Sequence, residues 1–338
     1  MMTFREELER QEHLRLRERA AFSDESAGRV RPEEDSIDDV RTCYQRDTDR
    51  IVHCKAFRRL MHKTQVFLRP EGDHYRTRMT HTLEVSRIAR TICRALGFNV
   101  DLAEAIAMGH DLGHTPFGLA GERALAEMMG SEGFRHNEQS LRVVDHLEKG
   151  GEGLNLTYEV RMGILGHTGT RVPETLEGQV VRLADRMAYV NHDIDDAVRA
   201  GILRDTDIPR SISRVLGDNH SARLNTLVCD MIESSWESDT IVMSPLVERT
   251  LWDLRCFLFE RVYRNPVAKG EEGKAQDMLQ WLFRYYEEYP DRLPIDFQPQ
   301  ISMDGMKRTI CDYIAGMTDK FAVDKYTELF IPMGWHVR

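Results

Sequence analysis

Residues of metal-binding type recur on the expected buried faces of three helical segments. In "THTLEVSRIARTICRALG" (80–97), His81 shares a row with Val85, Ile88 and Ile92, at steps of four, three and four. That spacing places a histidine on the apolar face of a helix. The two other rows are Leu102, Ile106 and His110, and Val181, Asp185, Tyr189 and Asp193. Two imidazoles and a carboxylate therefore point into one interior, and Asp111 directly follows His110.

A divalent cation accounts for these inward polar groups more simply than separate hydrogen-bond partners do. One inward histidine is usually a satisfied core imidazole, but two histidines and two aspartates would each need a partner. A cation bound by imidazole and carboxylate satisfies them together. We therefore predict His81, His110, Asp111 and Asp185 as metal ligands. The nitrogen and oxygen set suits manganese, magnesium, iron, cobalt, nickel or zinc, and open ligand positions indicate catalysis.

Helices are expected to position these residues, and nearly the whole chain has a helical pattern. Thr80 and Asp101 are the expected N-caps of the two histidine-bearing helices, and Gly97 is the expected end of the first. Only "QVFLRP" (65–70) suggests a strand. Residues 3–20 predict a charged helix, and "SDESAGRVRPEEDSIDD" (23–39) predicts a loop or flexible arm that adds little to the core. The expected fold class is all-α.

The composition is that of a globular protein. The chain has 338 residues, of which 41% are hydrophobic and 30% charged, with a formal net charge of -10. No apolar run approaches the roughly 18 to 20 residues of a membrane span, and the first residues are too charged for a signal peptide, so we expect a cytoplasmic protein. The cysteines form no CxxC pair, which argues against a zinc ribbon or a disulfide framework. The acidic charge argues against general nucleic-acid binding.

Taken together, the motifs resemble those of the HD-domain phosphohydrolases, and within them the deoxyguanosinetriphosphate triphosphohydrolase-like family. The resemblance covers residues from about 45 to 335 and rests on "RDTDRIVHCKAFRRLMHKTQVF", "EGDHYRTRMTHTLEVSRIAR", "AIAMGHDLGHTPFG", "FRHNEQS", "LTYEVRMGIL", "LADRMAYVNHDIDDA" and "CDYIAGMTD". It implies an HD-domain helical core at 41–200. A charged helix and flexible arm (1–40) would precede this core, and additional C-terminal helices (201–338) would pack on it.

The resemblance also implies roles for individual residues. His81, His110, Asp111 and Asp185 match the family's metal ligands. The positions of His114, Glu122 and His136 match the acid, base and water-orienting groups beside the α-phosphate, where Asp111 also acts.

Substrate contacts follow from the same resemblance. Gln65 and Asp193 match residues that hold the sugar 3′-hydroxyl, and Tyr189 matches an aromatic residue that packs on the deoxyribose. Arg78 and Arg186 match cationic positions facing the phosphates. Arg58 belongs to a basic segment that reads equally well as a solvated helix face, but its place shortly before Gln65 favours a phosphate contact.

Two positions depart from the family pattern. The family usually reads HDLGHTPFGHAGE, whereas this chain has Leu119 in place of the last histidine of that run. The missing histidine lies near the scissile phosphate in relatives, so the proton-transfer scheme, the rate or the substrate preference is in question. Glu138 stands where the family often has alanine, and its charge would raise the proton affinity of His136.

Other features are interpreted as structural. His167 in "ILGHTG" is interpreted as a helix-end histidine rather than a ligand. The aromatic stretches "LRCFLFERVY" and "FRYYEEYP" are interpreted as core or subunit contacts rather than surfaces that stack nucleic-acid bases.

These observations predict a metal-dependent enzyme that hydrolyses deoxynucleoside triphosphates, dGTP among them, to the deoxynucleoside and inorganic triphosphate. The alternatives are an HD-type nucleotidase or phosphodiesterase, and a dNTP-binding regulatory protein in which Leu119 marks weakened catalysis. The expected partners are deoxynucleoside triphosphates and further copies of the chain. Single-stranded DNA is a possible partner, and a membrane is not expected.

Overall fold

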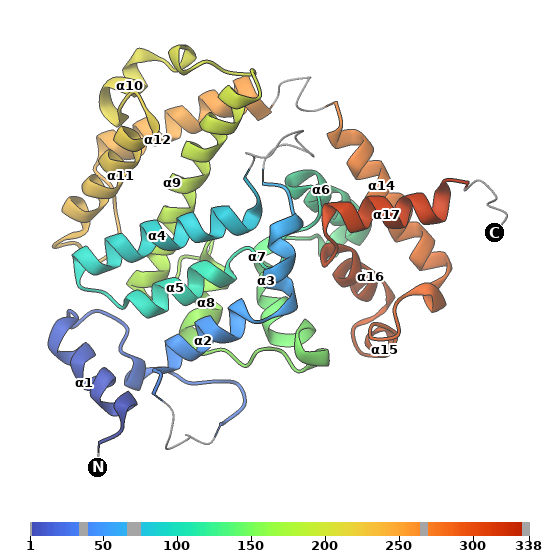
Figure 1. Cartoon of the computed structure of the whole chain (residues 1–338), viewed down its shortest axis with the longest axis horizontal. Helices are drawn as coiled ribbons and strands as arrows, with labels where there is room; N and C mark the ends of the chain where they lie inside the picture. Colours follow the sequence, from blue (N-terminus) through green and yellow to red (C-terminus); the bar gives the residue numbers. More distant parts are fainter. Residues whose placement is uncertain (1, 34–39, 66–75, 264–269, 333–338) are drawn as a thin grey trace, which may run out of the picture.

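The computed structural model describes residues 2–33, 40–65, 76–263 and 270–332, which form helices joined by loops (Figure 1). Within these ranges there is no β-strand, and only two isolated bridges occur, Arg29–Thr157 and Thr64–Thr77. The all-α prediction is therefore confirmed. Apart from Gln65, the candidate strand at 65–70 lies outside the described residues.

A large core forms around two long helices, α4 and α9, which pack on each other and on α5 and α8 (Figure 1). Its buried members include Val85, Ile88 and Ile92 on α4, which confirms the predicted inward stripe. The helices that contribute to this core are α2 (Cys43–Val52), α3 (Lys55–Arg59), α4 (Arg78–Leu96), α5 (Val100–Gly109), α8 (Tyr158–Gly166), α9 (Leu176–Arg199), α10 (Arg210–Leu216), α11 (His220–Ser235) and α12 (Pro245–Leu258).

A second core lies where the last helices meet α6 (Gly118–Met129). In Figure 1 these helices stand on the opposite side of the molecule from α10, α11 and α12. They are α14 (Glu272–Glu288), α15 (Gln298–Asp304), α16 (Met306–Ala315) and α17 (Asp319–Phe330). Phe283 and Tyr286 are buried in this core, which confirms the structural interpretation of "FRYYEEYP". The short helix α7 (His136–Arg142) packs on α8.

The two histidine-bearing helices begin slightly earlier than predicted. The N-cap of α4 is Thr77, whose backbone N–H donates to Thr80 Oγ1 at 3.1 Å, so the prediction of Thr80 was wrong by three residues. The N-cap of α5 is Asn99, whose side-chain oxygen accepts from the backbone nitrogens of Asp101 and Leu102. In both cases a competing cap residue stood just upstream. Gly97 ends α4 in the left-handed conformation, as predicted.

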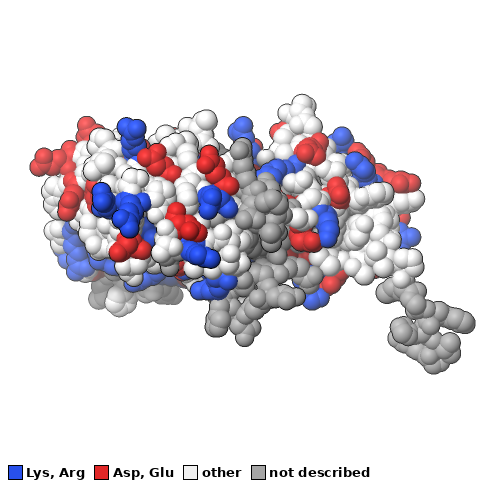
Figure 2. Space-filling view, turned by 90° about the horizontal axis from the view of Figure 1, so that it is seen from above, with Lys and Arg blue, Asp and Glu red and all other residues white. Residues whose placement is uncertain are grey.

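The molecular surface carries interspersed charges. On the face seen in Figure 2, the described Lys and Arg side chains alternate with Asp and Glu side chains. Such mixing differs from the one-sided basic field of a general nucleic-acid-binding protein. Among the described helices, none has the length and apolar content required to traverse a lipid bilayer.

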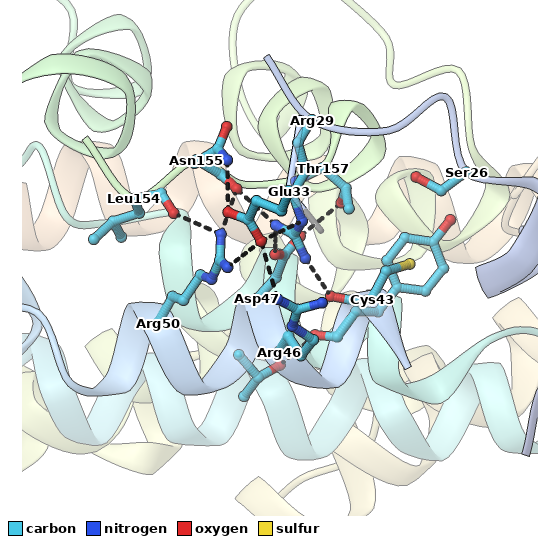
Figure 3. Close-up of polar contacts among 12 residues, drawn as sticks. Ser26, Arg29, Glu33, Cys43, Arg46, Asp47, Arg50, Leu154, Asn155 and Thr157 are labelled. Carbon is cyan, nitrogen blue, oxygen red and sulfur yellow. Dashed lines mark hydrogen bonds and ion pairs between the residues drawn. The ribbon is translucent and has the colours of Figure 1, made fainter. Parts of the chain in front are cut away.

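The segment after α1 (Phe4–Arg15) contributes more to the core than expected. Ala20 and Phe22 are buried, and Arg29 reaches the buried carboxylate of Asp47 (Figure 3). Apart from a short 3₁₀ turn at Ser23–Glu25, residues 23–33 are loop, as one of the two readings predicted, and long-range interactions of Arg29 and Glu33 attach this loop to the core. Residues 34–39 lie outside the described part of the chain. We define the arginine cluster as Arg29, Glu33, Arg46, Asp47, Arg50, Asn155 and Thr157.

Candidate metal centre

Four of the predicted ligands converge from three helices and one loop. His81 lies in the first turn of α4, His110 at the end of α5, Asp111 in the following loop, and Asp185 on α9. His81 Nε2 lies 3.0 Å from Asp185 Oδ1, and His110 Nε2 lies 3.4 Å from Asp111 Oδ1 and 3.8 Å from Asp185 Oδ1. The structure thus brings together the three residues that the helical rows singled out and Asp111, which follows His110.

The donor atoms at this position fit a divalent cation. His81, His110 and Asp111 can each offer one ligand atom, and these atoms lie within 4.8 Å of one another. His110 Nδ1 lies 2.7 Å from the backbone oxygen of Ala107, which fixes the proton on Nδ1 and leaves the Nε2 lone pair free to bind a metal. His110 Nε2 is buried and has no hydrogen-bond partner among the described residues. A bound cation would satisfy this orphaned atom.

The charges around Asp111 keep it ionised. Burial opposes ionisation, but the neighbouring His110 and Arg78 outweigh burial and hold the pKa of Asp111 well below its ordinary value. Arg78 Nη1 donates to Asp111 Oδ2 at 2.8 Å, and both side chains are almost completely buried. The predicted phosphate contact of Arg78 stays a prediction, and the structure places its guanidinium next to the metal ligands.

The loop that carries Asp111 is held by close backbone packing. Ser140 Oγ on α7 accepts from the backbone nitrogen of Gly113 and donates to the backbone oxygen of His110. A Cβ atom at position 113 would lie 2.1 Å from the backbone nitrogen of Ser140, so only glycine fits there. This explains physically why a glycine separates Asp111 from His114.

Beside the four ligands lies the predicted proton-transfer group. The rings of His114 and His136 stack with centroids 4.1 Å apart, and His136 Nδ1 lies 3.0 Å from Glu122 Oε2. Burial opposes protonation of His136, but the hydrogen bond with Glu122 prevails and raises the pKa of His136. Burial and the charge of Arg78 lower the pKa of His114 well below its ordinary value. The pKa values of the two stacked imidazoles are therefore shifted in opposite directions, which suits groups that exchange protons with a substrate.

His167 belongs to the same group of side chains, although we interpreted it as a helix-end histidine. It follows α8, is 2% exposed, and its Nε2 lies 3.3 Å from His136 Nε2. A usable signal was present, because Val160, Ile164 and His167 follow the same four-and-three spacing that identified His81. We define the histidine cluster as His81, His110, Asp111, His114, His136, His167 and Asp185.

Two of the predicted sugar-binding residues, Tyr189 and Asp193, lie on the side of α9 that carries Asp185. The third, Gln65, lies near α4. Asp193 is fully buried. Burial, together with the charge of Asp196, raises the pKa of Asp193 well above its ordinary value. Gln65 Oε1 is buried without a hydrogen-bond partner in the described part of the chain. Tyr189 is partly buried one helical turn from both Asp185 and Asp193.

Two predicted phosphate contacts do not join the histidine cluster. Arg58 is exposed on α3, and its guanidinium donates to the backbone oxygen of His53 at 3.2 Å. Ala56 and Phe57 fill the buried face of this short helix, which agrees with the solvated face that the sequence equally allowed, and the phosphate contact of Arg58 stays a prediction. Arg186 follows Asp185 on α9 but is exposed, so the structure leaves its phosphate contact as a prediction.

Lys63 holds the loop that carries Asp111 and His114 in place. Its ammonium group donates to the backbone oxygens of His114 and of Ala315, which joins the loop to α16. Burial, together with the charge of Arg59, lowers the pKa of Lys63 to about 7. A cavity of about 130 Å³ adjoins Lys63. It is lined by Lys63, Gly113 and residues of α16, and none of its lining residues belongs to the histidine cluster.

Leu119 lies in the first turn of α6 with half of its side chain exposed. The preceding Gly118 is close to the metal centre, since a Cβ atom there would lie 3.3 Å from Arg78 Nη2. The departure from the family pattern is therefore located at the edge of the site, and no ligand of the predicted metal is altered by it.

Comparison with known proteins agrees with this geometry. Residues 78–190 match the HD domain, and residues 241–328 match the phosphohydrolase-associated domain. A deoxyguanosinetriphosphate triphosphohydrolase-like protein of Caldanaerobacter subterraneus is 53% identical over 334 residues, covering 99% of this chain and 98% of the relative. The chain belongs to the deoxyguanosinetriphosphate triphosphohydrolase-like family. Like-named members from Desulfatibacillum aliphaticivorans and Clostridium perfringens are 48% and 46% identical, each across 98% of this chain and 98% or more of the relative. The HD match of this family member contains every residue of the histidine cluster.

Proposed function

We propose that the protein is a metal-dependent hydrolase that converts deoxynucleoside triphosphates, dGTP among them, to the deoxynucleoside and inorganic triphosphate. The observation that supports this most strongly is the convergence of His81, His110, Asp111 and Asp185 in a chain similar over its whole length to deoxyguanosinetriphosphate triphosphohydrolase-like proteins. These four residues would hold the cation. When bound, a divalent cation polarises a phosphate oxygen and lowers the pKa of water.

The residues around the cation site would do the rest of the chemistry. Arg78, held at Asp111, provides a fixed positive charge where negative charge develops on the phosphates. His114, with the Glu122–His136 pair beside it, would deliver a proton to the leaving 5′-oxygen. Arg186 would contribute further charge at the exposed edge.

An unsatisfied buried acceptor supports a deoxynucleoside. Gln65 Oε1 is buried without a hydrogen-bond partner in the described structure, and a sugar hydroxyl would satisfy such an acceptor. Asp193 would hold the same hydroxyl, and Tyr189 would pack on the deoxyribose and leave no space for a 2′-hydroxyl. These roles come from the family resemblance, and the unpaired oxygen of Gln65 is consistent with them.

The deciding experiment is product analysis. Metal-stripped protein is incubated with each dNTP and with manganese, magnesium, cobalt or nickel, and the products are separated by ion-exchange chromatography. Equal amounts of deoxynucleoside and triphosphate are expected. Release of orthophosphate, or opening of a cyclic nucleotide, would instead show a nucleotidase or phosphodiesterase. Tight dNTP binding without turnover under every metal would favour a regulatory protein, the alternative that Leu119 raises.

We also propose a homo-oligomer in the cytoplasm, with the N-terminal segment and the helices after residue 201 at the subunit contacts. The division at 1–40, 41–200 and 201–338 belongs to the same set of proposals. Light scattering coupled to size exclusion tests the oligomer.

Single-stranded DNA binding would show as a strongly salt-dependent affinity, and the mixed charges on the face in Figure 2 give it little support.

A further inference from the structure

The cavity beside Lys63 is a polar site separate from the histidine cluster. Its lining comes from α3, from Leu112 and Gly113, from the segment that follows α7, and from residues in and around α15 and α16. Its volume of about 130 Å³ equals that of roughly four water molecules in the liquid. Pockets for ligands the size of a nucleotide measure about 300 Å³ or more. The cavity therefore suits a small ligand with few heavy atoms.

Four cations line the cavity without an ion-pair partner in the described part of the chain. They are Lys55, Arg59, Lys63 and Lys149. A Cβ atom at Gly316, another lining residue, would lie 3.1 Å from Arg59 Nη1, which places the guanidinium at the cavity wall. Positive charge is thus gathered around a small volume, and an anion there would be attracted from several sides.

Lys63 is the most buried of these cations and is repelled by Arg59. Its side chain lies in a residue that is only 2% exposed. Burial is the main cause of its lowered pKa, and the charge of Arg59 is the next. The attraction of Asp319 and of Asp111 has a smaller effect. An anion between the Arg59 guanidinium and the Lys63 ammonium would offset this repulsion.

The acidic residues of the lining are largely engaged elsewhere. The Glu148 carboxylate accepts from the backbone nitrogens of Lys55 and Ala56, at 3.1 and 2.7 Å. Asp312 forms an ion pair with Arg142 at 2.7 Å. Asp296 is the third acid of the lining, and it is exposed. These acids leave the four cations of the lining in excess.

Hydrogen-bond donors are also available at this position. An ammonium group has three N–H donors, and within the described chain Lys63 uses two of them, on the backbone oxygens of His114 and Ala315. Gln300 lines the cavity, and its Oε1 is buried without a hydrogen-bond partner among the described residues. Because no described partner fixes this amide, its NH₂ group can turn toward a ligand. Donors and charge together match an oxyanion.

We propose that this cavity binds a free inorganic oxyanion of the size of orthophosphate, held by Arg59, Lys63 and Lys149 with the amide of Gln300. The anion would lie against Gly113, two residues from Asp111, and would give the Lys63 ammonium a counter-ion. Binding would therefore strengthen the contact by which Lys63 holds the loop. The proposal is independent of the proposed hydrolysis, since it needs neither the metal ligands nor turnover.

The competing explanation is a cavity filled by water. Lysine and arginine side chains often extend their charged groups into solvent without binding a ligand. In that case the protein would have no affinity for orthophosphate that depends on Arg59. Phosphate binding therefore distinguishes the two explanations.

The test is equilibrium dialysis of the metal-stripped full chain against radiolabelled orthophosphate. The wild type is expected to bind a phosphate whose affinity falls about tenfold or more in Arg59→Gln, the usual effect of losing one charged hydrogen-bond donor. Lys149→Gln changes an exposed residue, so it tests the site even if Arg59→Gln does not fold, and its affinity is expected to fall as well. Absence of binding by the wild type, or unchanged affinity in either variant, would overturn the proposal.

A matched control is Arg186→Gln, which removes the same charge from the exposed edge of the histidine cluster. Its affinity at the Arg59-dependent site is expected to equal that of the wild type. A loss as large as in Arg59→Gln would show a general charge effect or binding at the histidine cluster, and would overturn the proposal.

Competition defines the size of the ligand. A nucleoside monophosphate is expected not to displace the labelled orthophosphate that depends on Arg59, because the cavity has no room for a nucleoside. Displacement would show that the site takes the phosphate group of a larger molecule, against the proposal of a free ion. Product analysis with dNTPs is a separate measurement, so failure of the proposed hydrolysis would leave the phosphate result unchanged.

Discussion

Two polar clusters of seven residues each, the arginine cluster and the histidine cluster, differ in how many of their buried polar atoms have hydrogen-bond partners within the described chain. In the arginine cluster, Asp47 accepts from Arg29 and from both the backbone nitrogen and the hydroxyl of Thr157 (Figure 3). Glu33 in turn accepts from Arg50 and Asn155. In the histidine cluster, by contrast, His110 Nε2, His81 Nδ1 and His114 Nδ1 are buried without partners in the described structure.

The contrast separates a structural network from a binding site. A buried polar network is tolerated when every member is satisfied, and an unsatisfied buried group costs about 1 to 3 kcal/mol. The arginine cluster fixes the N-terminal segment to the core, and the carboxylates of Asp47 and Glu33 are satisfied by donors from within the chain. The histidine cluster retains unpaired atoms of one chemical kind, all of them suited to cations, and so depends on a ligand for full satisfaction.

The largest expected effect is on catalysis in the histidine cluster. Asp111→Ala removes a carboxylate of the predicted metal centre, so we expect the rate of dNTP hydrolysis to fall on the order of 1,000-fold or more. Bound Mn²⁺ is expected to fall in parallel. Initial rates and elemental analysis measure both effects. Asp195→Ala, which removes an acid paired with Arg76 at 3.3 Å, is the control and is expected to retain activity and metal. Wild-type turnover in Asp111→Ala would remove the metal mechanism from consideration.

The second effect is on stability in the arginine cluster. Arg29→Ala leaves the fully buried Asp47 carboxylate without its cation, and breaking a buried pair costs about 3 to 5 kcal/mol. Urea unfolding measures the loss, and metal content of the folded protein should not change. Arg135→Ala, which breaks an exposed pair with Glu138, should cost less than about 1 kcal/mol. Equal losses in the two variants would contradict the structural role of the arginine cluster.

A third prediction concerns Lys63, a buried cation bound only to backbone oxygens. Its pKa is about 7 in the folded protein against an ordinary value of 10.5. Between these values the unfolded chain binds the extra proton, so the free energy of unfolding gains a contribution that grows as pH rises from 7 to 10.5. Lys63→Met should flatten this part of the stability curve. The exposed Lys55→Met is the control, and an unchanged slope in Lys63→Met would refute the assignment.

The smallest expected effect is at Leu119. Because His114, Glu122 and His136 are already in place, Leu119→His is expected to change the turnover rate by less than about tenfold, below the usual contribution of a general acid. Metal content should stay the same, since Leu119 is not a ligand. Steady-state kinetics with dGTP tests this. A rate increase of two orders of magnitude would show that the chain lacks a proton donor that Leu119 has displaced.

Helical periodicity predicted the fold class and the inward ligands, because the spacing of apolar residues within a single segment determines which face of a helix is buried. His81, His110 and Asp185 were found in this way. The same rule would have found His167, which was set aside as a helix-end residue. The orientation of Arg58, which is exposed on α3, could not be predicted in this way, because a basic segment does not reveal which of its side chains faces inward. The ordering of residues 23–33 could not be predicted either, since it depends on Asp47 and Asn155, partners distant in sequence.

The carboxylate of Asp319, at the start of α17, connects the loop between α5 and α6, which carries Asp111 and His114, to the C-terminal helices. It accepts from the backbone nitrogen of Phe117, which has a φ of 61°, and from the nitrogen and hydroxyl of Thr64. A left-handed phenylalanine costs roughly 1 to 2 kcal/mol and persists only when its surroundings hold it. The stretch that matches the HD domain is therefore not a portable module: an excised 78–190 fragment would lose the anchor that shapes its own loop, and grafting it onto another scaffold would require an equivalent of Asp319.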